Sequence, residues 1–442
     1  MKKSLPLLLL LALITTILAG CQSKNDVSPD TASETTGQNA GKETEITMVT
    51  LSDYDKYGLN DVISSFEKAN PTIKVKLEMY PFNNYFETLE VKLGSRSTDY
   101  DLIMVDGPLI SNYTVKGYLA PLDSYLKPEQ WNSKWVDSSV KAGTYNGKLM
   151  AAPMDTSTQV LYYNKDLFEQ KGITPPSSDP DQRWTWEQVV DAAAKLTYDT
   201  NGDGQNDVFG FGFEQVSRAY QILSLSDSLG AKPLSDDGLV ATGYTNSDKF
   251  VQAGKFYYDL FHTSKVSPKT DQTQEYFKTG KLAMLIGGTW DPKIFAEAKV
   301  NFGIALHPYF AGQKAATPTG SWHLGISETS GKKEAAAKFI EYLTLGEGAK
   351  IWFEKDGSLP ANVDVLNAID QDPKYDQFPN NLYRIASYEA KNTAVSRPVT
   401  PGYLDWESLY FKAFEDIRNG IEPKQALDGI VTQMDRQLKK YE

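Results

Sequence analysis

Near the start of the folded chain, segments with a strand-like pattern of apolar residues alternate with segments with a helical pattern. Short runs rich in β-branched residues alternate with longer segments in which apolar positions recur every three or four residues. The predicted elements are strands over residues 46–51, 73–80 and 101–106, with helices over 59–69 and 82–93 between them. The apolar run from Leu102 to Val105 is uninterrupted, which is typical of a strand covered on both faces in a parallel sheet. The pattern therefore predicts an α/β fold.

Ligands of open α/β sheets bind at the carboxyl ends of the strands. The loops over 52–57 and 106–112 follow predicted strands, so we expect ligand contacts there first. Thr185 and Gln188 have the spacing of a capping box at a helix start. The other expected elements are a strand over 282–286, a helix over 334–343 and C-terminal helices interrupted near Gly420 and Pro423.

The first 42 residues have a different composition. Two lysines precede a short apolar run that ends in small residues directly before Cys21, the single cysteine of the chain. We interpret residues 1–20 as a lipoprotein signal peptide and Cys21 as the lipidated first residue of the mature chain; an ordinary secretory signal is the alternative. Residues 21–42 are too polar to form a core and are expected to be a flexible tether. The predicted location is the extracytoplasmic face of the cell membrane, with the lipid as the only attachment.

The charge of the chain limits its partners. The 442 residues carry a formal net charge of −12, which argues against nucleic acid because that partner requires clustered Lys and Arg. The three histidines are not paired at metal-ligand spacing. We expect no redox or organic cofactor.

Several short motifs, taken in order, resemble those of one family. They are Pro153-Met154-Asp155, the run from Val160 to Phe168, Trp184-Thr185-Trp186-Glu187, Phe277-x-x-Gly280-Lys281-Leu282-Ala283-Met284 and Gly287-x-x-Trp290. Together with the lipoprotein signal, they resemble the extracellular solute-binding proteins of ABC importers, family 1. The most similar branch is the maltose-binding-protein-like one, which handles sugars and oligosaccharides. The resemblance extends over residues 43–442.

This resemblance implies a two-lobe fold of the periplasmic-binding-protein type, with hinge crossings and a ligand cleft between the lobes. The implied lobes are 43–153 plus 307–356 and 154–306 plus 357–442, with crossings near Pro153, near His307-Pro308 and from Gly357 to Pro360. It also implies a monomer that is not an enzyme, closes on a carbohydrate and delivers it to the transmembrane subunits of a permease.

Carbohydrates present apolar C–H faces and hydroxyl groups, which suit aromatic rings bordered by polar side chains. Trp290 and Trp406 match positions where the resembling sugar binders place stacking aromatics, and Trp322 begins a strand that returns to the first lobe. Further cleft contacts are expected at Asp106, Tyr54, Asp155, Gln159 and Arg397. The tryptophans expected to pack are Trp131, Trp135, Trp184, Trp186 and Trp352. The segment from Met104 to Pro108 lacks the aromatic and acid-arginine cluster of maltose-binding proteins, so maltodextrin itself is not implied.

A second local pattern resembles a calcium loop. Side-chain oxygens recur at loop positions 1, 3, 5 and 9, with a glycine at position 6 and a backbone carbonyl at position 7. The predicted ligands are Asp199, Asn201, Asp203, Gln205 and Asp207. Position 12 is Gly210 rather than a bidentate glutamate, so the remaining ligands must come from elsewhere. We expect a structural Ca²⁺; the alternative is a solvated acidic turn.

Three other functions fit parts of the chain. A cationic solute, such as a polyamine or a quaternary ammonium compound, would also suit aromatic walls with acidic groups. A secreted glycoside hydrolase would use paired carboxylates. A serine β-lactamase would use Ser138-x-x-Lys141, Tyr162-x-Asn164 and Lys278-Thr279-Gly280, but the Gly and Asn residues after Lys141 break the helix that this chemistry requires.

Overall fold

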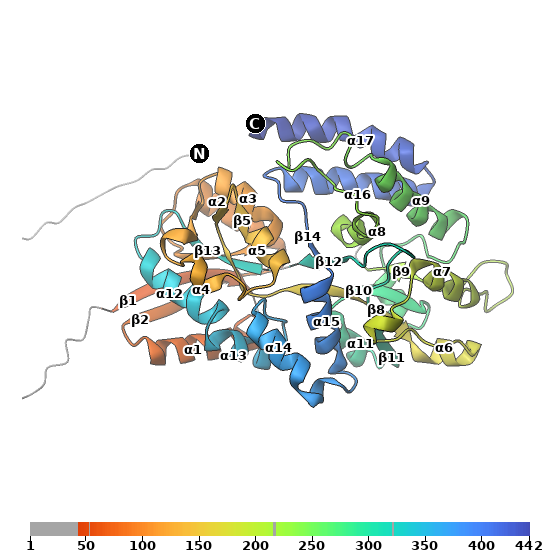
Figure 1. The fold of residues 1–442 in the computed structure, drawn as a ribbon, viewed down its shortest axis with the longest axis horizontal. Helices are drawn as coiled ribbons and strands as arrows, with labels where there is room; N and C mark the ends of the chain where they lie inside the picture. The colour runs from red at the N-terminus through yellow and green to blue at the C-terminus, as the bar shows by residue number, and fades with distance from the viewer. Residues whose placement is uncertain (1–42, 53, 215–217, 321) are drawn as a thin grey trace, which may run out of the picture. The chain divides into compact units, whose positions relative to one another are not determined.

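The computed structural model describes residues 43–52, 54–214, 218–320 and 322–442. Two mixed sheets organise the described chain, and we call the parts packed around them the first and the second lobe (Figure 1). In the first sheet the strand order is β2-β1-β3-β13-β4, with β7 paired to β13. Its strands are β1 (Thr44–Leu51), β2 (Ile73–Tyr80), β3 (Leu102–Asp106), β4 (Leu119–Ala120), β7 (Ala152–Pro153) and β13 (Trp322–Ser327).

The predicted β-α-β-α-β unit is confirmed. Strand β1 runs parallel to both β2 and β3, and the connecting helices are α1 (Asn60–Ala69) and α2 (Phe82–Gly94). All five residues of β3 are buried, as the uninterrupted apolar run predicts for a central strand. The carboxyl ends of these three strands therefore lie at one edge of the first sheet.

The second sheet has the strand order β14-β12-β8-β10-β9, with β11 also paired to β8. Its strands are β8 (Ser157–Asn164), β9 (Gly212–Phe213), β10 (Met284–Gly288), β11 (Phe302–Ala305), β12 (Thr317–Gly320) and β14 (Ala394–Ser396). Strand β8 lies at the centre and is antiparallel to β10, β11 and β12. The first residues of β8 consequently lie beside the last residues of β10 and β12.

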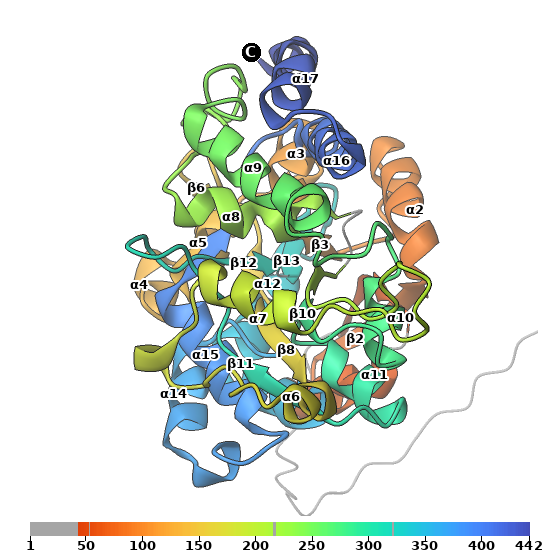
Figure 2. The ribbon, with the colours of Figure 1, turned by 90° about the vertical axis from the view of Figure 1, so that its right-hand side faces the viewer.

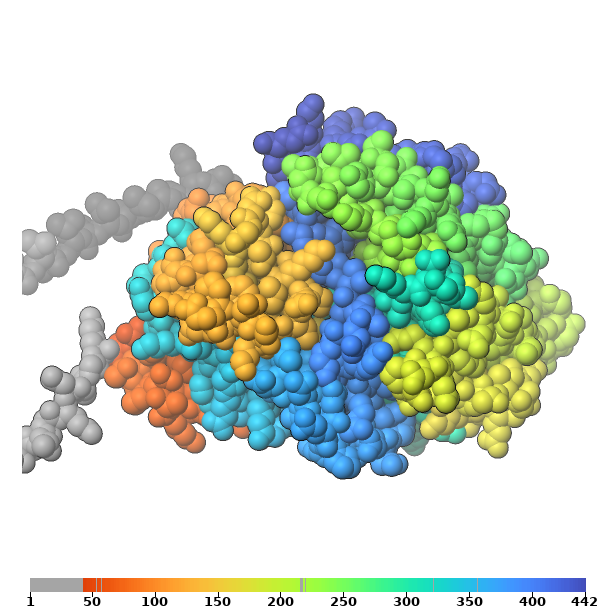
Figure 3. Space-filling view, viewed as in Figure 1, coloured from red at the N-terminus to blue at the C-terminus, as the bar shows by residue number. Residues whose placement is uncertain are grey.

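Most of the remaining chain is helical. The described α-helices after α2 are α3 (Ile110–Val115), α4 (Pro128–Trp131), α5 (Asp137–Gly143), α6 (Lys165–Lys171), α7 (Trp186–Lys195), α8 (Leu223–Ser228), α9 (Asp248–His262), α10 (Thr273–Lys278), α11 (Asp291–Glu297), α12 (Lys333–Thr344), α13 (Glu347–Asp356), α14 (Val363–Gln371), α15 (Asn381–Asn392), α16 (Tyr403–Asn419) and α17 (Pro423–Leu438). A small hairpin pairs β5 (Thr144–Tyr145) with β6 (Lys148–Leu149). Figure 3 shows the blue segment that carries α14 and α15 on the surface between the orange and the yellow-green parts of the chain.

Local sequence signals explain several of these boundaries. The Thr185 hydroxyl accepts a hydrogen bond from the Gln188 backbone, and the Gln188 side chain returns one to the Thr185 backbone, so the predicted capping box is present at the start of α7. Helices α16 and α17 are separated at Gly420, which adopts a left-handed conformation after the last helical residue. Trp135, Trp186 and Trp352 are fully buried in the core, as expected of packing residues. Trp131 and Trp184 are half-buried against it.

The chain changes sheets at defined points. It leaves the first sheet after Pro153 and enters the second at Ser157, and it returns between Gly320 and Trp322. We expected the return near His307-Pro308, but β12 follows that point and pairs with β8 and β14 in the second sheet. Residues 307–320 therefore belong with the second lobe. The Pro308 signal marks a loop inside that lobe rather than a crossing.

Candidate ligand-binding site between the lobes

Strand ends from the two sheets meet at the crossings. Asp106 ends β3 and is the register partner of Trp322, which begins β13. From the second sheet, Gly320 ends β12 and Arg397 directly follows β14. The guanidinium of Arg397 donates to both carboxylate oxygens of Asp106, one of the two bonds at 3.3 Å. The carboxyl ends of parallel strands in the two sheets thus face one another, which is where α/β folds bind ligands.

Arg397 and Asp106 belong to a wider charge cluster, in which Arg218 is partly exposed. A guanidinium nitrogen of Arg218 lies 3.5 Å from the Asp106 carboxylate, and another lies 3.6 Å from Glu407. Tyr403 donates to Glu407 at 2.9 Å. Burial disfavours the charged form of Arg397, but the charge and hydrogen bond of Asp106 together with Tyr403 and Tyr220 outweigh it and hold the pKa of the guanidinium above its ordinary value. Two arginines and two carboxylates therefore balance each other at the junction of the lobes.

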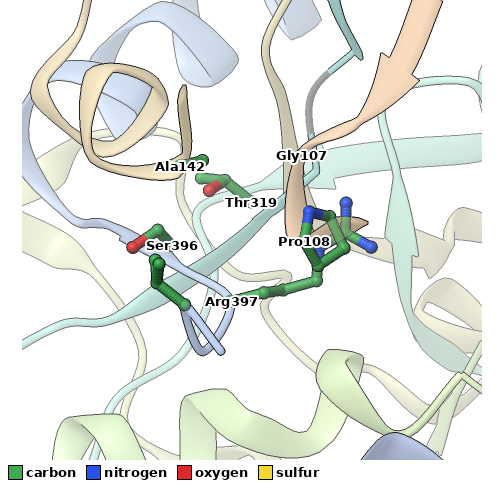
Figure 4. Close-up of a pocket in the computed structure, with 7 residues that line it drawn as sticks. Gly107, Pro108, Ala142, Thr319, Ser396 and Arg397 are labelled. Carbon is green, nitrogen blue, oxygen red and sulfur yellow. The ribbon is translucent and has the colours of Figure 1, made fainter. Parts of the chain in front are cut away.

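A small cavity opens beside this cluster (Figure 4). Its volume is about 10 Å³, close to the minimum that holds a single water molecule. Arg397 extends across it towards Pro108 in Figure 4, with Thr319 and Ser396 on the opposite side. A larger groove of about 510 Å³ adjoins it at Val399 and is lined by Asp137, Val140, Lys141, Thr144 and Asp236. In this conformation the lobes lie too close at Arg397 to admit a sugar ring there.

Trp290 is the aromatic side chain best placed to contact a ligand. It follows β10 and is 38% exposed, which is unusual for so large an apolar ring. Its indole N–H donates to Oε1 of the buried Glu214 at 3.2 Å, so the ring is held at the strand end. A Cβ atom on Gly288 would lie 2.1 Å from the indole, and only glycine lets the ring lie across the backbone here.

A buried carboxyl pair supports this arrangement. The Gly288 backbone N–H donates to Oε2 of Glu214 at 3.1 Å and to Oδ2 of Asp291 at 2.9 Å. Gln274 donates to Asp291 at 2.8 Å. Burial, together with the neighbouring Glu214 charge, raises the pKa of Asp291 well above its ordinary value. The protonated form of the Asp291 carboxyl is therefore favoured by its surroundings.

Gln159 lies next to Trp290 on the same face of the second sheet. Gln159 pairs with Gly288 in the antiparallel ladder, so side chains at these two positions point to the same face of the sheet. The Trp290 indole occupies the space that a side chain on Gly288 would take. The Gln159 side chain is only 1% exposed, and neither its Oε1 nor its Nε2 has a hydrogen-bond partner among the described residues. Such an amide is expected to find a partner, so it is suited to a ligand hydroxyl.

Three other residues that we expected in the cleft contact the backbone or the first lobe. They are Asp155, Trp322 and Tyr54. Oδ1 of Asp155 accepts the Trp322 backbone N–H at 2.8 Å, which ties two crossing segments together. Trp322 itself is half-buried and nearly parallel to Phe86, with ring centroids 6.3 Å apart. Tyr54 stacks on the buried Trp352 at 5.4 Å.

Trp406 is placed differently from Trp290. Its side chain is 0% exposed within α16, where it stacks on Tyr410 with centroids 4.9 Å apart and lies 5.8 Å from the ring of Tyr403. The indole has no open face in this conformation. Its position is that of a core residue and gives no support to the stacking role expected from the sequence.

The acidic loop from Asp199 to Asp207 is closed by its own hydrogen bonds. The Asp199 carboxylate accepts the backbone N–H groups of Asn201, Gly202 and Gly204, and Asp207 accepts two hydrogen bonds from Thr200. The Gly204 and Gly202 bonds lower the pKa of Asp199. Asn201 and Asp203 likewise accept backbone N–H groups, of Asp203 and Gln205. No three His, Cys, Asp or Glu side chains of the described residues are grouped as a metal site. This geometry does not support the predicted Ca²⁺ site.

Two expectations concern membrane attachment. Cys21, the signal peptide and the tether lie outside the described residues. Among the helices that the structure describes, none is long and apolar enough to cross a membrane.

Several contributors to the site were not found from the sequence. Glu214, Arg218 and Glu407 lie in segments without a recognisable motif, and only tertiary contacts bring them to the strand ends. Phe86 lies in the helix predicted over residues 82–93, but periodicity does not tell a core ring from one at the edge of a sheet. The position of Glu214 directly after a short strand is the one signal that could have identified it.

Comparisons with known proteins agree with this fold. Residues 50–350 match the family model described as bacterial extracellular solute-binding protein. The galactooligosaccharide-binding protein of Bacillus subtilis is 25% identical over 99% of this chain and 98% of its own length. The ABC substrate-binding protein Lmo0181 of Listeria monocytogenes, solved with cycloalternan, is 28% identical with a TM-score of 0.74, covering 90% of this chain and all of that one.

A third relative binds a smaller sugar. A solute-binding protein of an ABC transporter from Thermotoga lettingae, solved with α-D-tagatose, is 26% identical with a TM-score of 0.71, covering 90% of this chain and all of that one. The family model spans well over half of the chain, and the two-lobe fold is shared across the lobes described above. The chain is therefore a member of the bacterial extracellular solute-binding protein family, whose members bind solutes rather than catalyse reactions.

Proposed function

We propose that this chain is the substrate-capturing subunit of an ABC importer and that its ligand is a carbohydrate. Three of the relatives described above support the ligand class, since their names or bound molecules are sugars or oligosaccharides. Within the chain, one observation carries the proposal: the exposed Trp290 ring lies beside the unpartnered amide of Gln159. An aromatic face with an adjacent amide matches the C–H face and hydroxyl group of a pyranose.

Capture is proposed to work by hinge closure. A ligand that contacts Trp290 in the second lobe and the Asp106 end of the first lobe binds better when the lobes are close. The small cavity beside Arg397 supports a pathway in which the lobes first separate, because a sugar does not fit there as the lobes stand. The ligand-closed form is then presented to the transmembrane subunits of the permease.

At the Asp106 end of the cleft, the charge cluster argues against a cationic solute. A polyamine or quaternary ammonium ligand would require carboxylates that are free of positive partners. In the cleft, Asp106 is paired with Arg397, and Glu407 lies near Arg218. Capture of a cation would leave two arginines without their carboxylates, which is unfavourable in a buried site.

A thermal-shift screen tests the proposed ligand class. The folded fragment over residues 43–442 is mixed with glucose, galactose, tagatose, maltooligosaccharides and galactooligosaccharides, and in parallel with spermidine, choline and glycine betaine. A ligand specific to the folded state raises Tm. A rise with a carbohydrate, abolished in Trp290→Ala and insensitive to salt, supports the proposal. A rise with cations alone, weakening as salt increases, overturns it.

The membrane attachment is part of the same proposal. Lipidation of Cys21 would hold a monomeric receptor at the outer face of the cell membrane, and two features of the sequence, the signal pattern and the polar tether, support this. Fractionation of cells that express Cys21→Ala tests it. Retention of this variant in the membrane fraction would contradict the lipid anchor.

Calcium at the loop from Asp199 to Asp207 remains a proposal that rests on the sequence pattern. Titration with Ca²⁺ after chelation should raise Tm of the parent protein and leave Asp203→Asn unchanged. The Asp203 carboxylate makes a single hydrogen bond to a backbone N–H within the loop, so its removal perturbs the turn less than removal of Asp199. An unchanged parent Tm would identify the loop as an acidic turn.

A further inference from the structure

Two buried carboxyl groups beside the Trp290 ring share their hydrogen-bond donors. Oε2 of Glu214 and Oδ2 of Asp291 accept the same backbone N–H, that of Gly288, at 3.1 and 2.9 Å. The Gln274 amide also reaches both groups, at 2.8 Å from Oδ1 of Asp291 and 3.5 Å from Oε1 of Glu214. We call Glu214 and Asp291 the carboxyl pair. The two residues are only 1% and 0% exposed, so the pair is removed from bulk water.

The carboxyl pair lies where four elements of the second lobe meet. Glu214 directly follows β9, and Asp291 is the first residue of α11. Helix α10, which carries Gln274, lies beside α11 and β10 (Figure 2). Strand β10 ends at Gly288, two residues before Trp290. The indole of Trp290 donates to Oε1 of Glu214 at 3.2 Å. The carboxyl pair therefore holds both the ring and the turn that carries it.

The geometry of the carboxyl pair requires a proton. Two ionised carboxylates that accept the same N–H would repel each other in a site removed from bulk water. Burial, the Glu214 charge and a hydrogen bond with Glu214 raise the pKa of Asp291 well above its ordinary value, and the Gln274 and Gly288 donors lower it by less. A proton on Asp291 replaces the repulsion by a hydrogen bond to Glu214, so the two groups titrate as one unit.

The other titratable groups on the surrounding elements are neutral, paired or at the surface. From β8, Tyr162 is buried, and its pKa is raised by burial and by the charges of Asp291 and Glu214. Its hydroxyl donates to a backbone carbonyl at 2.6 Å. Arg218, which follows Glu214 in the chain, lies near Asp106 and Glu407. The other charged residues of α10 and α11 lie at the surface: Glu275, Lys278, Lys293 and Glu297.

We propose that Asp291 is a positioning residue for the ligand site, which donates its proton to Glu214 in a hydrogen bond and so holds the Trp290 ring in place for a carbohydrate. This inference rests on the proposed function. Loss of the proton would leave two adjacent buried charges, whose separation would displace the acceptor of the indole. Since the pair keeps its proton at low pH and releases it at high pH, the affinity for a carbohydrate should fall as pH rises.

The first test needs no ligand. Urea unfolding from pH 5 to pH 8 compares the parent with Asp291→Asn, whose amide can donate to Glu214 without titrating. The folded parent binds a proton that the unfolded chain releases. Its unfolding constant should therefore rise, relative to that of Asp291→Asn, by up to about tenfold per pH unit until the folded pair titrates. A difference infrared spectrum should also contain the band of a protonated carboxyl.

Glu214→Gln is the second variant, because its amide can donate to Asp291 and it removes the same proton if Asp291→Asn does not fold. Parallel pH profiles of the parent and both variants, without a protonated carboxyl band, would overturn the inference whatever the ligand.

The second test is the pH profile of carbohydrate affinity. Calorimetric titration from pH 5 to pH 8 uses glucose, galactose, tagatose, maltotriose and galactotriose. The parent should lose up to about tenfold of affinity as pH rises, the effect expected for loss of a central aromatic contact. Asp291→Ala should bind weakly at every pH, whereas Asp291→Asn should restore affinity and flatten the profile. Glu275→Gln, at an exposed position of α10, is the matched control and should follow the parent.

The outcomes separate this inference from the proposed function. Absence of binding to every saccharide would overturn both. Binding by the parent that does not change with pH, or that changes equally in Asp291→Asn, would overturn the positioning role and leave the carbohydrate-binding function intact. Affinities are measured below the unfolding transition of each variant, so that lost binding does not reflect unfolding.

Discussion

Individual side chains in the cleft have distinct functions that their burial and partners reveal. Trp290 offers an open face, whereas Trp406 is enclosed by its own helix and neighbours. Glu214 contacts the indole N–H and the strand end together. At this scale the proposed ligand contact depends on Trp290, and its orientation depends on Glu214.

Trp290→Ala should weaken carbohydrate binding by at least about tenfold, because central aromatic contacts carry much of the energy of a binding site. Glu214→Ala should weaken it less and should also reduce the ligand-induced change in tryptophan fluorescence, since the ring loses its acceptor. Ile421→Ala, an exposed apolar residue in the turn between α16 and α17, is the control. Glu214→Ala binding at parental affinity with a parental fluorescence change would contradict the positioning role.

His307 predicts a pH effect on stability. Its imidazole is fully buried, and this burial lowers its pKa from 6.5 to about 3. Between these values the unfolded chain binds a proton that the folded chain excludes, so stability falls as pH falls, by about 1.4 kcal/mol per unit from this group alone. Urea unfolding from pH 7 to pH 4 should therefore show His307→Gln losing less stability than the parent. Parallel pH profiles would contradict the prediction.

Helices and strands fix the positions of these residues. Helix α2 is held against two strands by one buried side chain, Tyr85. The Tyr85 hydroxyl binds two strand carbonyls from within the core. Without it, α2 would lose its hydrogen-bonded link to β1 and β3.

Tyr85→Phe should destabilise the protein by about 1–3 kcal/mol, because the single hydroxyl proton that the two buried carbonyls share is lost and water does not replace it. Chemical denaturation measures this directly. The control is Tyr198→Phe, whose hydroxyl makes an exposed hydrogen bond to Gln170 at 3.3 Å and should cost less than about 0.5 kcal/mol. Equal effects of the two substitutions would show that α2 is held by apolar packing alone.

At the scale of elements, the sequence predicted what is local and periodic. The first three strands, both connecting helices and the Thr185 cap were confirmed because each depends on neighbouring residues. Strand β12 was missed, since Thr317–Gly320 is short, contains Pro318 and lacks alternation. Arg397 and Asp106 were both candidates, but their pairing across 291 positions of sequence depends on tertiary structure.

The whole molecule is organised by contacts between the lobes. Arg397 and Asp106 form the buried ion pair that joins their strand ends. In the proposed hinge closure this contact has to break when the lobes separate, so its strength is expected to set part of the balance between open and closed forms.

The double variant Asp106→Asn, Arg397→Gln should favour the open form without ligand, because it removes both charges and leaves neither stranded. Small-angle scattering should show a larger radius of gyration than for the parent. Lys232→Gln, which breaks an exposed pair with Asp236, is the control and should leave the radius unchanged. An unchanged radius in the double variant would show that other contacts hold the lobes.

The same ion pair affects how the protein responds to the salt concentration outside the cell, which the organism does not regulate. The side chains of Arg397 and Asp106 are 7% and 12% exposed, so dissolved ions screen their attraction far less than that of a surface pair. The resting balance of the receptor should then stay nearly constant from fresh to brackish surroundings, and nutrient uptake would be insulated from salinity.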